Sequence, residues 1–229
     1  MKLVSIVGDS VSTYEGYNPP GYAVYYDEQK ISLNGMTSVY DTWWAKVNQA
    51  LKANLCVNNS YSGSRVSGLD FPAATSRMRL MNLHFGQYMP NIILVNMGYN
   101  DFGYGVKISK GKWHSLRKKD LMYFEDAYHF LLEELNMIYP EAEIVCGTLM
   151  RTKMVGNIRW IFPETFGGVP FDQYNDVIRK ACKKQKCHLA DINRLNICYE
   201  TLDGSHPTIN GHLTIADAWV EALRDIGML

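Results

Sequence analysis

The chain has 229 residues, of which 47% are hydrophobic and 20% are charged, a composition typical of one globular domain with a buried core. Its 23 basic and 23 acidic side chains cancel, and this balance argues against a nucleic-acid-binding protein. No apolar run approaches the roughly 20 residues of a membrane span, and the opening run 3–7 is too short for a signal peptide. We expect a single domain over residues 1–229, without a membrane or nucleic-acid partner. With the sequence as given, we expect the protein to be cytoplasmic, although an export signal that had been removed would leave no trace in it.

Five apolar, β-branched runs recur along the chain and predict strands. They lack a clean alternation of apolar and polar residues, as expected of parallel strands that are buried on both faces. The predicted strands lie at residues 2–8, 54–60, 91–98, 142–148 and 187–192.

Helical patterns occupy the segments between these runs. Capping residues and apolar residues spaced by three or four positions indicate where the helices begin and which face they bury. The helices are expected at residues 42–53, 76–85, 120–140 and 171–181, and near the carboxyl end, where Ile215, Trp219 and Leu223 share one face. Alternating strands and helices predict a doubly wound α/β sheet with right-handed crossovers.

Three connections are long for a compact domain, at residues 14–40, 101–119 and 150–170. They follow the first, third and fourth predicted strands, so they leave the sheet at the edge where its strands end. Ligands bind at that edge in sheets of this type. We therefore expect the three loops to surround a common crevice.

The first predicted strand ends in the tripeptide "GDS" at residues 8–10. Either this is an ordinary turn, or Gly8 lets the chain turn off the strand and present Ser10 for chemistry. Near the carboxyl end, Asp203 and His206 lie three residues apart. A nucleophilic serine needs a base and a group that orients the base, so these two side chains are candidate partners of Ser10. Alternatively, Asp203 caps its turn and His206 is a packing or surface histidine.

Two further segments end predicted strands, "NNSYSGSRVSG" at 58–68 and "NMGYND" at 96–101. Acyl transfer requires hydrogen-bond donors aimed at the developing oxyanion. The backbone N–H groups of Gly63 and Ser10 and the side-chain amide of Asn100 could provide them. Glycine and asparagine are also favoured in tight turns, so either segment alone has a purely structural explanation.

These four segments come in the order of the motifs of the SGNH hydrolases, also called GDSL esterases/lipases, and the chain resembles this family from residue 8 to residue 206. The resemblance implies a three-layer, flavodoxin-like α/β sandwich with a five-stranded parallel sheet. It also implies roles for individual residues: Ser10 as nucleophile, His206 as base, Asp203 as the residue that orients the base, Ser10, Gly63 and Asn100 as oxyanion donors, and Asp9 as a structural brace.

Two positions depart from the family pattern. Val11 stands where the family name has leucine, which changes side-chain size rather than chemistry. The second segment is rich in glycine, so Gly68 could take the place of Gly63, although the spacing favours Gly63.

The family hydrolyses several kinds of ester, and only the long loops indicate which kind this chain takes. Aromatic residues in two loops would suit stacking on a sugar ring: Tyr14, Tyr17, Tyr104 and Trp113. The alternative is that they pack the loops themselves. No aliphatic patch or amphipathic lid is visible. We expect a serine esterase that acts on O-acyl, and above all O-acetyl, esters of a carbohydrate or other small polar compound. A lysophospholipase or thioesterase, or a non-catalytic sugar-binding protein, is the alternative.

The cysteines and histidines do not indicate a metal or cofactor. The five cysteines are irregularly spaced and are expected to be reduced and mostly buried. Cys182, Cys187 and His188 fit no common zinc pattern, because four residues separate the two cysteines. The basic cluster at 179–187 is typical of the solvated end of a helix.

Overall fold

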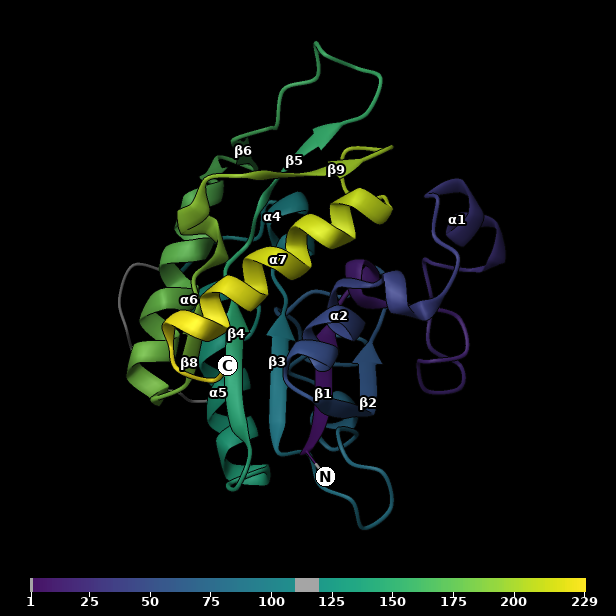
Figure 1. Cartoon of the computed structure of the whole chain (residues 1–229). Helices are drawn as coiled ribbons and strands as arrows, with labels where there is room; N and C mark the ends of the chain where they lie inside the picture. Colours follow the sequence, from purple (N-terminus) through teal and green to yellow (C-terminus); the bar gives the residue numbers. More distant parts are fainter. Residues whose placement is uncertain (1, 110–119) are drawn as a thin grey trace.

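Five parallel strands form the central sheet of the computed structural model, which describes residues 2–109 and 120–229 (Figure 1). The strand order is β2-β1-β3-β4-β8. Their bounds are β1 Lys2–Gly8, β2 Ala53–Ser60, β3 Ile92–Asn96, β4 Glu143–Gly147 and β8 His188–Ala190. All five were predicted from their apolar runs, and the expected α/β fold with a five-stranded parallel sheet is confirmed.

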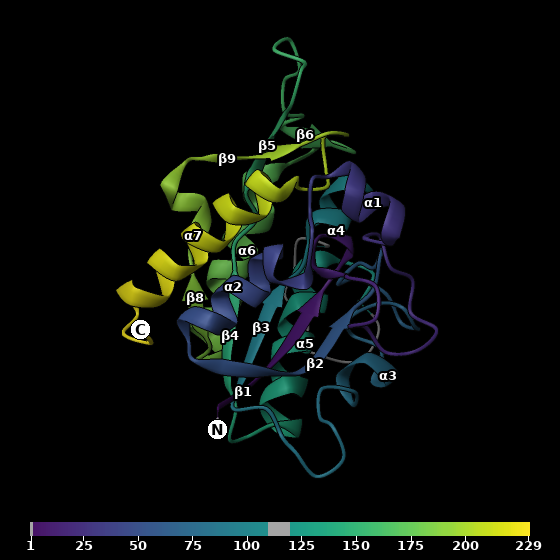
Figure 2. The ribbon, with the colours of Figure 1, turned by 45° about the vertical axis from the view of Figure 1, so that its right-hand side comes forward.

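Helices cover both faces of this sheet, as two views of the ribbon show (Figures 1 and 2). On one face α2 and α7 pack together, and the ring of Trp43 stacks on that of Trp219 at 5.1 Å. On the other face α5 and α6 bury Phe124, Tyr128 and Ile178. The helices are α1 Glu28–Leu33, α2 Trp43–Ala50, α3 Arg77–Leu80, α4 Tyr99–Gly103, α5 Phe124–Ile138, α6 Phe171–Gln185 and α7 Ile209–Asp225.

Four shorter strands lie outside the central sheet. They form two pairs, β5 Arg151–Met154 with β9 Cys198–Thr201 and β6 Thr165–Phe166 with β7 Val169–Pro170. The sequence did not predict them, because strands of two to four residues carry too little periodicity. The helix expected at 76–85 was too long, since only α3 is helical there. In Figure 1 the chain between β5 and β6 projects beyond the carboxyl edge of the sheet.

The carboxyl ends of three neighbouring strands meet at one edge of the sheet. Gly8, the last residue of β1, is in register with Ser60 of β2 on one side and with Asn96 of β3 on the other. The segments that follow these residues therefore leave the sheet side by side. This edge, with α1, α4 and the β5–β9 pair around it, is at the top of Figure 1.

Gly8 is required by the close packing of its neighbours. A Cβ at this position would lie 2.5 Å from Ser12 Oγ and 2.6 Å from Ser60 Oγ. The φ of Gly8 is not among the positive values, so a left-handed turn is not the reason for the glycine. The hypothesis that Gly8 serves to turn the chain is therefore corrected: it leaves room for the two serines.

A buried arginine ties the ends of β1 and β2 together. Arg79 is 1% exposed, and its guanidinium donates hydrogen bonds to Gly8 O at 3.0 Å, to Asn59 O at 2.7 Å and to Pro72 O at 2.8 Å. Burial lowers the pKa of Arg79 to about 10, so the group stays charged at neutral pH. Its hydrogen bonds hold the strand ends from which the loops of this edge begin.

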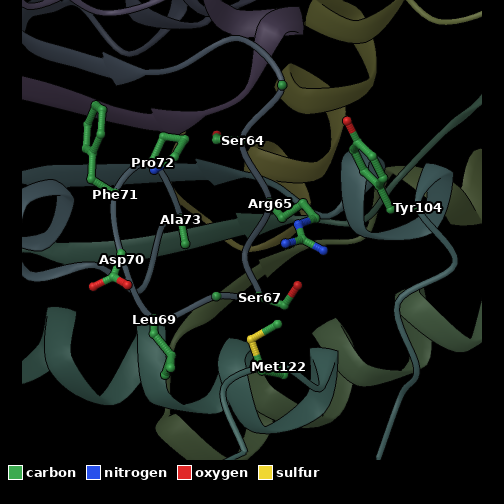
Figure 3. Close-up of a pocket in the computed structure, with 12 residues that line it drawn as sticks. Ser64, Arg65, Ser67, Leu69, Asp70, Phe71, Pro72, Ala73, Tyr104 and Met122 are labelled. Atoms are coloured by element: carbon green, nitrogen blue, oxygen red, sulfur yellow. The ribbon is translucent and has the colours of Figure 1, made fainter.

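Asp101 of α4 fixes the loop that follows β2, part of which is drawn in Figure 3. Its carboxylate accepts hydrogen bonds from the N–H groups of Val66 at 2.7 Å and Ser67 at 2.9 Å. Burial raises the pKa of Asp101 to about 6, while these hydrogen bonds act in the opposite direction. Asp101 thus joins the segments after β2 and β3, which carry Gly63 and Asn100.

Candidate active site

Ser10 begins a short 3₁₀ turn, Ser10–Ser12, immediately after β1. Asp9 caps this turn, because its Oδ1 accepts the N–H of Val11 at 3.0 Å. Burial raises the pKa of Asp9 to about 6, against the effect of that hydrogen bond. Trp44 Nε1 donates to Ser12 O at 2.9 Å and so anchors the end of the turn. Ser10 is thereby held with only 7% of its surface exposed.

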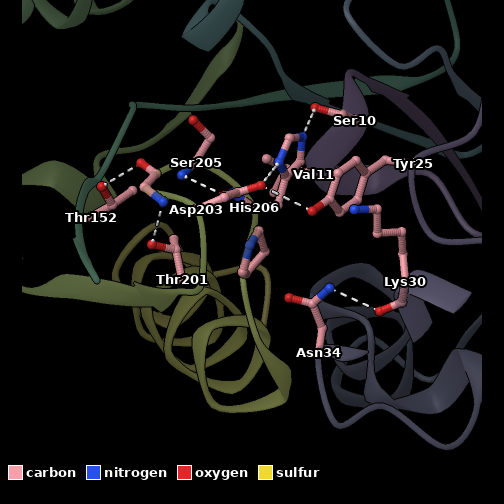
Figure 4. Close-up of polar contacts among 12 residues, drawn as sticks. Ser10, Val11, Tyr25, Lys30, Asn34, Thr152, Thr201, Asp203, Ser205 and His206 are labelled. Carbon is pink, nitrogen blue, oxygen red and sulfur yellow. Dashed lines mark hydrogen bonds and ion pairs between the residues drawn. The ribbon is translucent and has the colours of Figure 1, made fainter. Parts of the chain in front are cut away.

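The structure brings His206 and Asp203 to Ser10, although the serine lies at the other end of the chain (Figure 4). His206 Nε2 is 3.0 Å from Ser10 Oγ. His206 Nδ1 is 2.7 Å from Asp203 Oδ2. With the Nδ1 proton donated to the carboxylate, Nε2 is free to accept the proton of the Ser10 hydroxyl.

The turn that carries Asp203 and His206 is rigidly held. Asp203 Oδ1 accepts the N–H groups of Ser205 at 2.9 Å and His206 at 2.8 Å. Partial burial alone would raise the pKa of Asp203, but the hydrogen bonds and charge of His206 hold it well below its usual range. Gly204 has a φ of +88°, and a Cβ there would lie 3.1 Å from the ring of Trp160. This left-handed conformation and close approach explain the glycine between the two polar residues.

Tyr25, which the sequence analysis did not single out, contacts both members of this pair. Its hydroxyl donates to Asp203 Oδ2 at 3.0 Å, and its ring stacks on the His206 ring, with centroids 3.4 Å apart and planes inclined by 7°. Burial and the Asp203 charge raise the pKa of Tyr25, so the hydroxyl keeps its proton. The abundance of tyrosine in 14–29 was the only signal for this contact.

Three donors are available for an oxyanion beside Ser10. In the part of the chain that the structure describes, no group accepts the N–H of Ser10 or of Gly63. Asn100 Nδ2 donates one hydrogen to Ser64 O at 2.9 Å and has a second hydrogen. The N–H of Gly68 donates to Leu121 O at 2.8 Å, so the alternative of Gly68 as donor is not supported.

A cavity of about 380 Å³ opens over Ser10, His206 and Asn100. The 150–170 loop lines it, as the sequence predicted for the crevice, with Trp160, Pro163 and Phe166. Arg151 positions this loop, because its guanidinium pairs with Glu164 at 2.8 Å. Neither Trp160 nor Phe166 was among the predicted substrate-binding residues, since nothing in the sequence says which of the loop's residues point inward.

A second hollow of about 690 Å³ is lined mainly by residues of the loop that follows β2 (Figure 3), and Gly63 is one of them. Leu69, Phe71 and Met122 give it an apolar part. Arg65 contributes a guanidinium that lies over the ring of Tyr104, 5.5 Å from its centroid.

Of the predicted aromatic substrate contacts, the three that lie within the described residues do not line the cavity over Ser10. Tyr14 is 8% exposed and packs against Tyr17, whose ring in turn lies 6.2 Å from that of Trp44. The prediction for Tyr14 is corrected, because its ring is buried in the packing of the loop, whereas Tyr17 is 45% exposed and does not line this cavity. Tyr104 is 71% exposed and lines the second hollow instead. Trp113 lies outside the described residues.

Two further observations concern the described residues only. Among them no group of three or more His, Cys, Asp or Glu side chains is placed to hold a metal ion. No helix within residues 2–109 and 120–229 is long and apolar enough to cross a membrane.

The chain is similar to known proteins over its whole length. Residues 2–223 match the family described as GDSL-like lipase/acylhydrolase. The crystal structure of a GDSL-like lipase from Bacteroides ovatus is 26% identical, with a TM-score of 0.76, and the match covers 98% of this chain and 99% of that one. One from Bacteroides uniformis is 27% identical, with a TM-score of 0.72 and coverages of 98% and 96%.

A more distant structure shares the fold. It is a family two carbohydrate esterase from Clostridium thermocellum in complex with cellohexaose, 19% identical, with a TM-score of 0.57 and coverages of 100% and 65%. No curated protein matches the chain.

Proposed function

Because the chain belongs to the GDSL-like lipase/acylhydrolase family, it is an ester hydrolase, and we propose that it cleaves O-acetyl or other short O-acyl esters of a carbohydrate through an acyl-enzyme on Ser10. The observation that carries the proposal is the chain of contacts from Ser10 Oγ to His206 Nε2 at 3.0 Å and from His206 Nδ1 to Asp203 at 2.7 Å. These three residues line a cavity with aromatic walls.

In the first half of the proposed reaction, Ser10 Oγ bonds to the ester carbonyl carbon while its proton moves to His206 Nε2. The carbonyl electron pair moves onto oxygen, where Asn100 and the N–H groups of Ser10 and Gly63 stabilise the negative charge. The carbonyl then reforms and the bond to the alkoxide oxygen breaks. His206 gives its proton to that oxygen, and the alcohol leaves.

In the second half, water takes the place of the alcohol. Its oxygen bonds to the acyl carbon as His206 Nε2 takes one of its protons. The bond to Ser10 Oγ breaks, the proton returns to Ser10, and a carboxylic acid is released. In both halves His206 is positively charged next to the ionised Asp203, whose depressed pKa keeps it negative at working pH.

The aromatic walls support a sugar as the alcohol. His206 protonates the leaving oxygen, so the alcohol lies on the His206 side of Ser10. Trp160 and Phe166 line the cavity, and Trp160 lies against Gly204 of the turn that carries His206. Its flat ring with a polar N–H suits stacking on a sugar ring. The same fold carries a carbohydrate esterase in Clostridium thermocellum, although at 19% identity that likeness concerns the fold alone.

A longer acyl group is the second candidate, and the second hollow favours it. Gly63, a proposed oxyanion donor, also lines this hollow, and Leu69, Phe71 and Met122 make part of its wall apolar. An acyl chain could bury its methylenes there. This candidate corresponds to a lysophospholipase or thioesterase.

A chain-length series separates the two candidates. Each methylene that a pocket buries contributes up to ~0.8 kcal/mol, so a long-chain site would favour octanoate over acetate by orders of magnitude. We expect kcat/KM for p-nitrophenyl acetate to be at least as high as for the octanoate, and acetate to be released from acetylated xylan or another acetylated sugar. A steady rise of kcat/KM to eight carbons would establish the long-chain candidate instead, and Leu69→Ser should then abolish the rise.

Replacement of the proposed side-chain oxyanion donor should affect the transition state more than substrate binding. Asn100→Ala is expected to lower kcat by about 10²–10³ with little change in KM, since the charge arises only as the carbonyl is attacked. Asn100→Ala also removes the hydrogen bond to Ser64 O, so thermal unfolding of the variant checks that the loop keeps its fold without this bond. An effect on KM alone would mean that Asn100 binds the substrate.

A further inference from the structure

The ring of Tyr25 lies flat on the imidazole of His206, and its hydroxyl holds the same carboxylate that orients this imidazole. From this geometry we infer that Tyr25 is a positioning residue: its ring favours the charged form of His206, and its hydroxyl fixes Asp203. The inference rests on the proposed function, because it assigns Tyr25 a part in the proton transfer between Ser10 and His206.

The stacking geometry favours a cation. Two neutral aromatic rings prefer an offset or edge-to-face arrangement over a face-to-face sandwich, because the negative faces repel each other. Here the centroids are 3.4 Å apart and the planes are nearly parallel. A cation over an aromatic face is attracted instead. The Tyr25 ring therefore stabilises the imidazolium of the transition state more than the neutral imidazole of the resting enzyme, which is the condition for acceleration.

Tyr25 is held in this position by contacts on either side of the site. Its backbone N–H donates to Thr13 Oγ1 at 2.9 Å, and Thr13 Oγ1 donates to Ser10 O at 2.9 Å. The neighbouring Tyr26 ring packs edge-on at 4.9 Å, and its hydroxyl donates to Pro207 O at 2.7 Å. The ring is thus joined both to the turn that carries Ser10 and to the residue after His206.

Other charged and titratable groups also face this pair. Asp203 is ionised, and Asp9 is buried close enough for its charge to be felt at His206. Lys30 Nζ of α1 lies 5.4 Å from the centroid of the Tyr25 ring. Burial lowers the pKa of His212 to about 3, so that histidine is neutral at working pH. None of these four residues is substituted in the variants of Tyr25, and Tyr25→Phe and Tyr25→Leu both lose the hydrogen bond to Asp203, so a difference between the two variants reports on the ring.

Two variants separate the ring from the hydroxyl. Tyr25→Phe keeps the ring and removes the donor to Asp203, whereas Tyr25→Leu removes both. With p-nitrophenyl acetate, we expect Tyr25→Leu to have a kcat about 3- to 30-fold below that of Tyr25→Phe, with KM nearly equal. The acid limb of kcat/KM should lie about half a pH unit or more lower in Tyr25→Leu than in Tyr25→Phe, because the charged histidine loses the ring.

The Tyr25 hydroxyl should shift the acid limb of kcat/KM in the direction opposite to that of the ring. Without the Tyr25 hydroxyl as a donor, Asp203 keeps more negative charge for His206. The acid limb of kcat/KM for Tyr25→Phe should therefore lie at the same pH as that of the wild type or at a higher pH. Tyr40→Leu, which removes an exposed ring of the same 14–40 connection, is the matched control and should leave both kcat and the limb unchanged. Thermal unfolding of each variant checks that the fold is retained. If Tyr25→Leu does not fold, the phenylalanine variant decides, and an acid limb below that of the wild type overturns the proposal.

A readout without substrate separates this proposal from the proposed function. NMR titration of the His206 ring, assigned with His206→Gln, should show the same order of midpoints, with Tyr25→Leu below Tyr25→Phe. Equal midpoints and equal acid limbs in the two variants would overturn the role of Tyr25. If the wild-type protein hydrolyses none of the esters tested, the proposed function fails, and the titration alone decides the interaction of Tyr25 with His206.

Discussion

Ser10→Ala is expected to lower the turnover of an activated ester by roughly 10⁴-fold or more. The loss follows from the position of Ser10 Oγ, 3.0 Å from the only described side chain that could take its proton, His206. Alanine removes the nucleophile and leaves the turn in place, because Asp9 caps it through the N–H of Val11 rather than through Ser10. The measurement is steady-state hydrolysis of p-nitrophenyl acetate by the wild type and the variant at matched concentrations.

Ser12→Ala is the matched control, since Ser12 lies on the same turn and its hydroxyl accepts from Trp43 Nε1 at 3.2 Å instead of facing His206. This variant should keep most of the activity. Turnover that persists in Ser10→Ala would mean that the reaction uses another nucleophile. Absence of turnover in the wild type with all esters would favour a binding protein on this fold.

Asp203→Asn is expected to lower kcat by about 10³–10⁴ with little change in KM. The carboxylate accepts four hydrogen bonds, two at Oδ1 from backbone N–H groups and two at Oδ2 from His206 and Tyr25. An amide keeps the shape but has one oxygen, so one pair of donors faces an NH₂ group. If that pair is His206 and Tyr25, the imidazole turns to the tautomer whose Nε2 carries a proton and cannot accept one from Ser10.

The measurement is the separate determination of kcat and KM for Asp203→Asn. Asp27→Asn is a suitable control, because Asp27 also accepts a backbone N–H, that of Lys30 at 2.8 Å, at the start of α1 and outside the cavity. A loss of less than tenfold in Asp203→Asn would mean that Ser10 and His206 work as a pair without a third member.

The fold was predictable because its five strands are buried on both faces and therefore stand out as uninterrupted apolar runs. The short strands outside the sheet were harder to predict, because they do not form such apolar runs. β5 has the sequence "RTKM" and pairs only with β9, so neither strand shows the pattern of a core strand. Their position nevertheless matters for function, since Thr152 Oγ1 donates to Gly204 O at 2.8 Å and supports the turn with Asp203 and His206.

The candidate site was predictable where residue type and order along the chain define the chemistry. Ser10, Asp203 and His206 each follow or precede a predicted element, and the topology of a parallel sheet carries them to one edge. Residues that act through shape were missed. Tyr25 and Trp160 look like any other aromatic residue of their loops, and only the folded chain shows that their rings lie against His206 and Gly204.

A fluorophosphonate probe read by mass spectrometry shows directly whether Ser10 is the nucleophile. The probe forms a covalent bond with an activated serine, so we expect one adduct per chain. It should lie on Ser10 within the tryptic peptide 3–30, be assigned by fragmentation against Ser5 and Ser12, and be lost in Ser10→Ala. An adduct on another residue, or an intact mass without an adduct while ester hydrolysis is active, would mean that Ser10 is not the nucleophile.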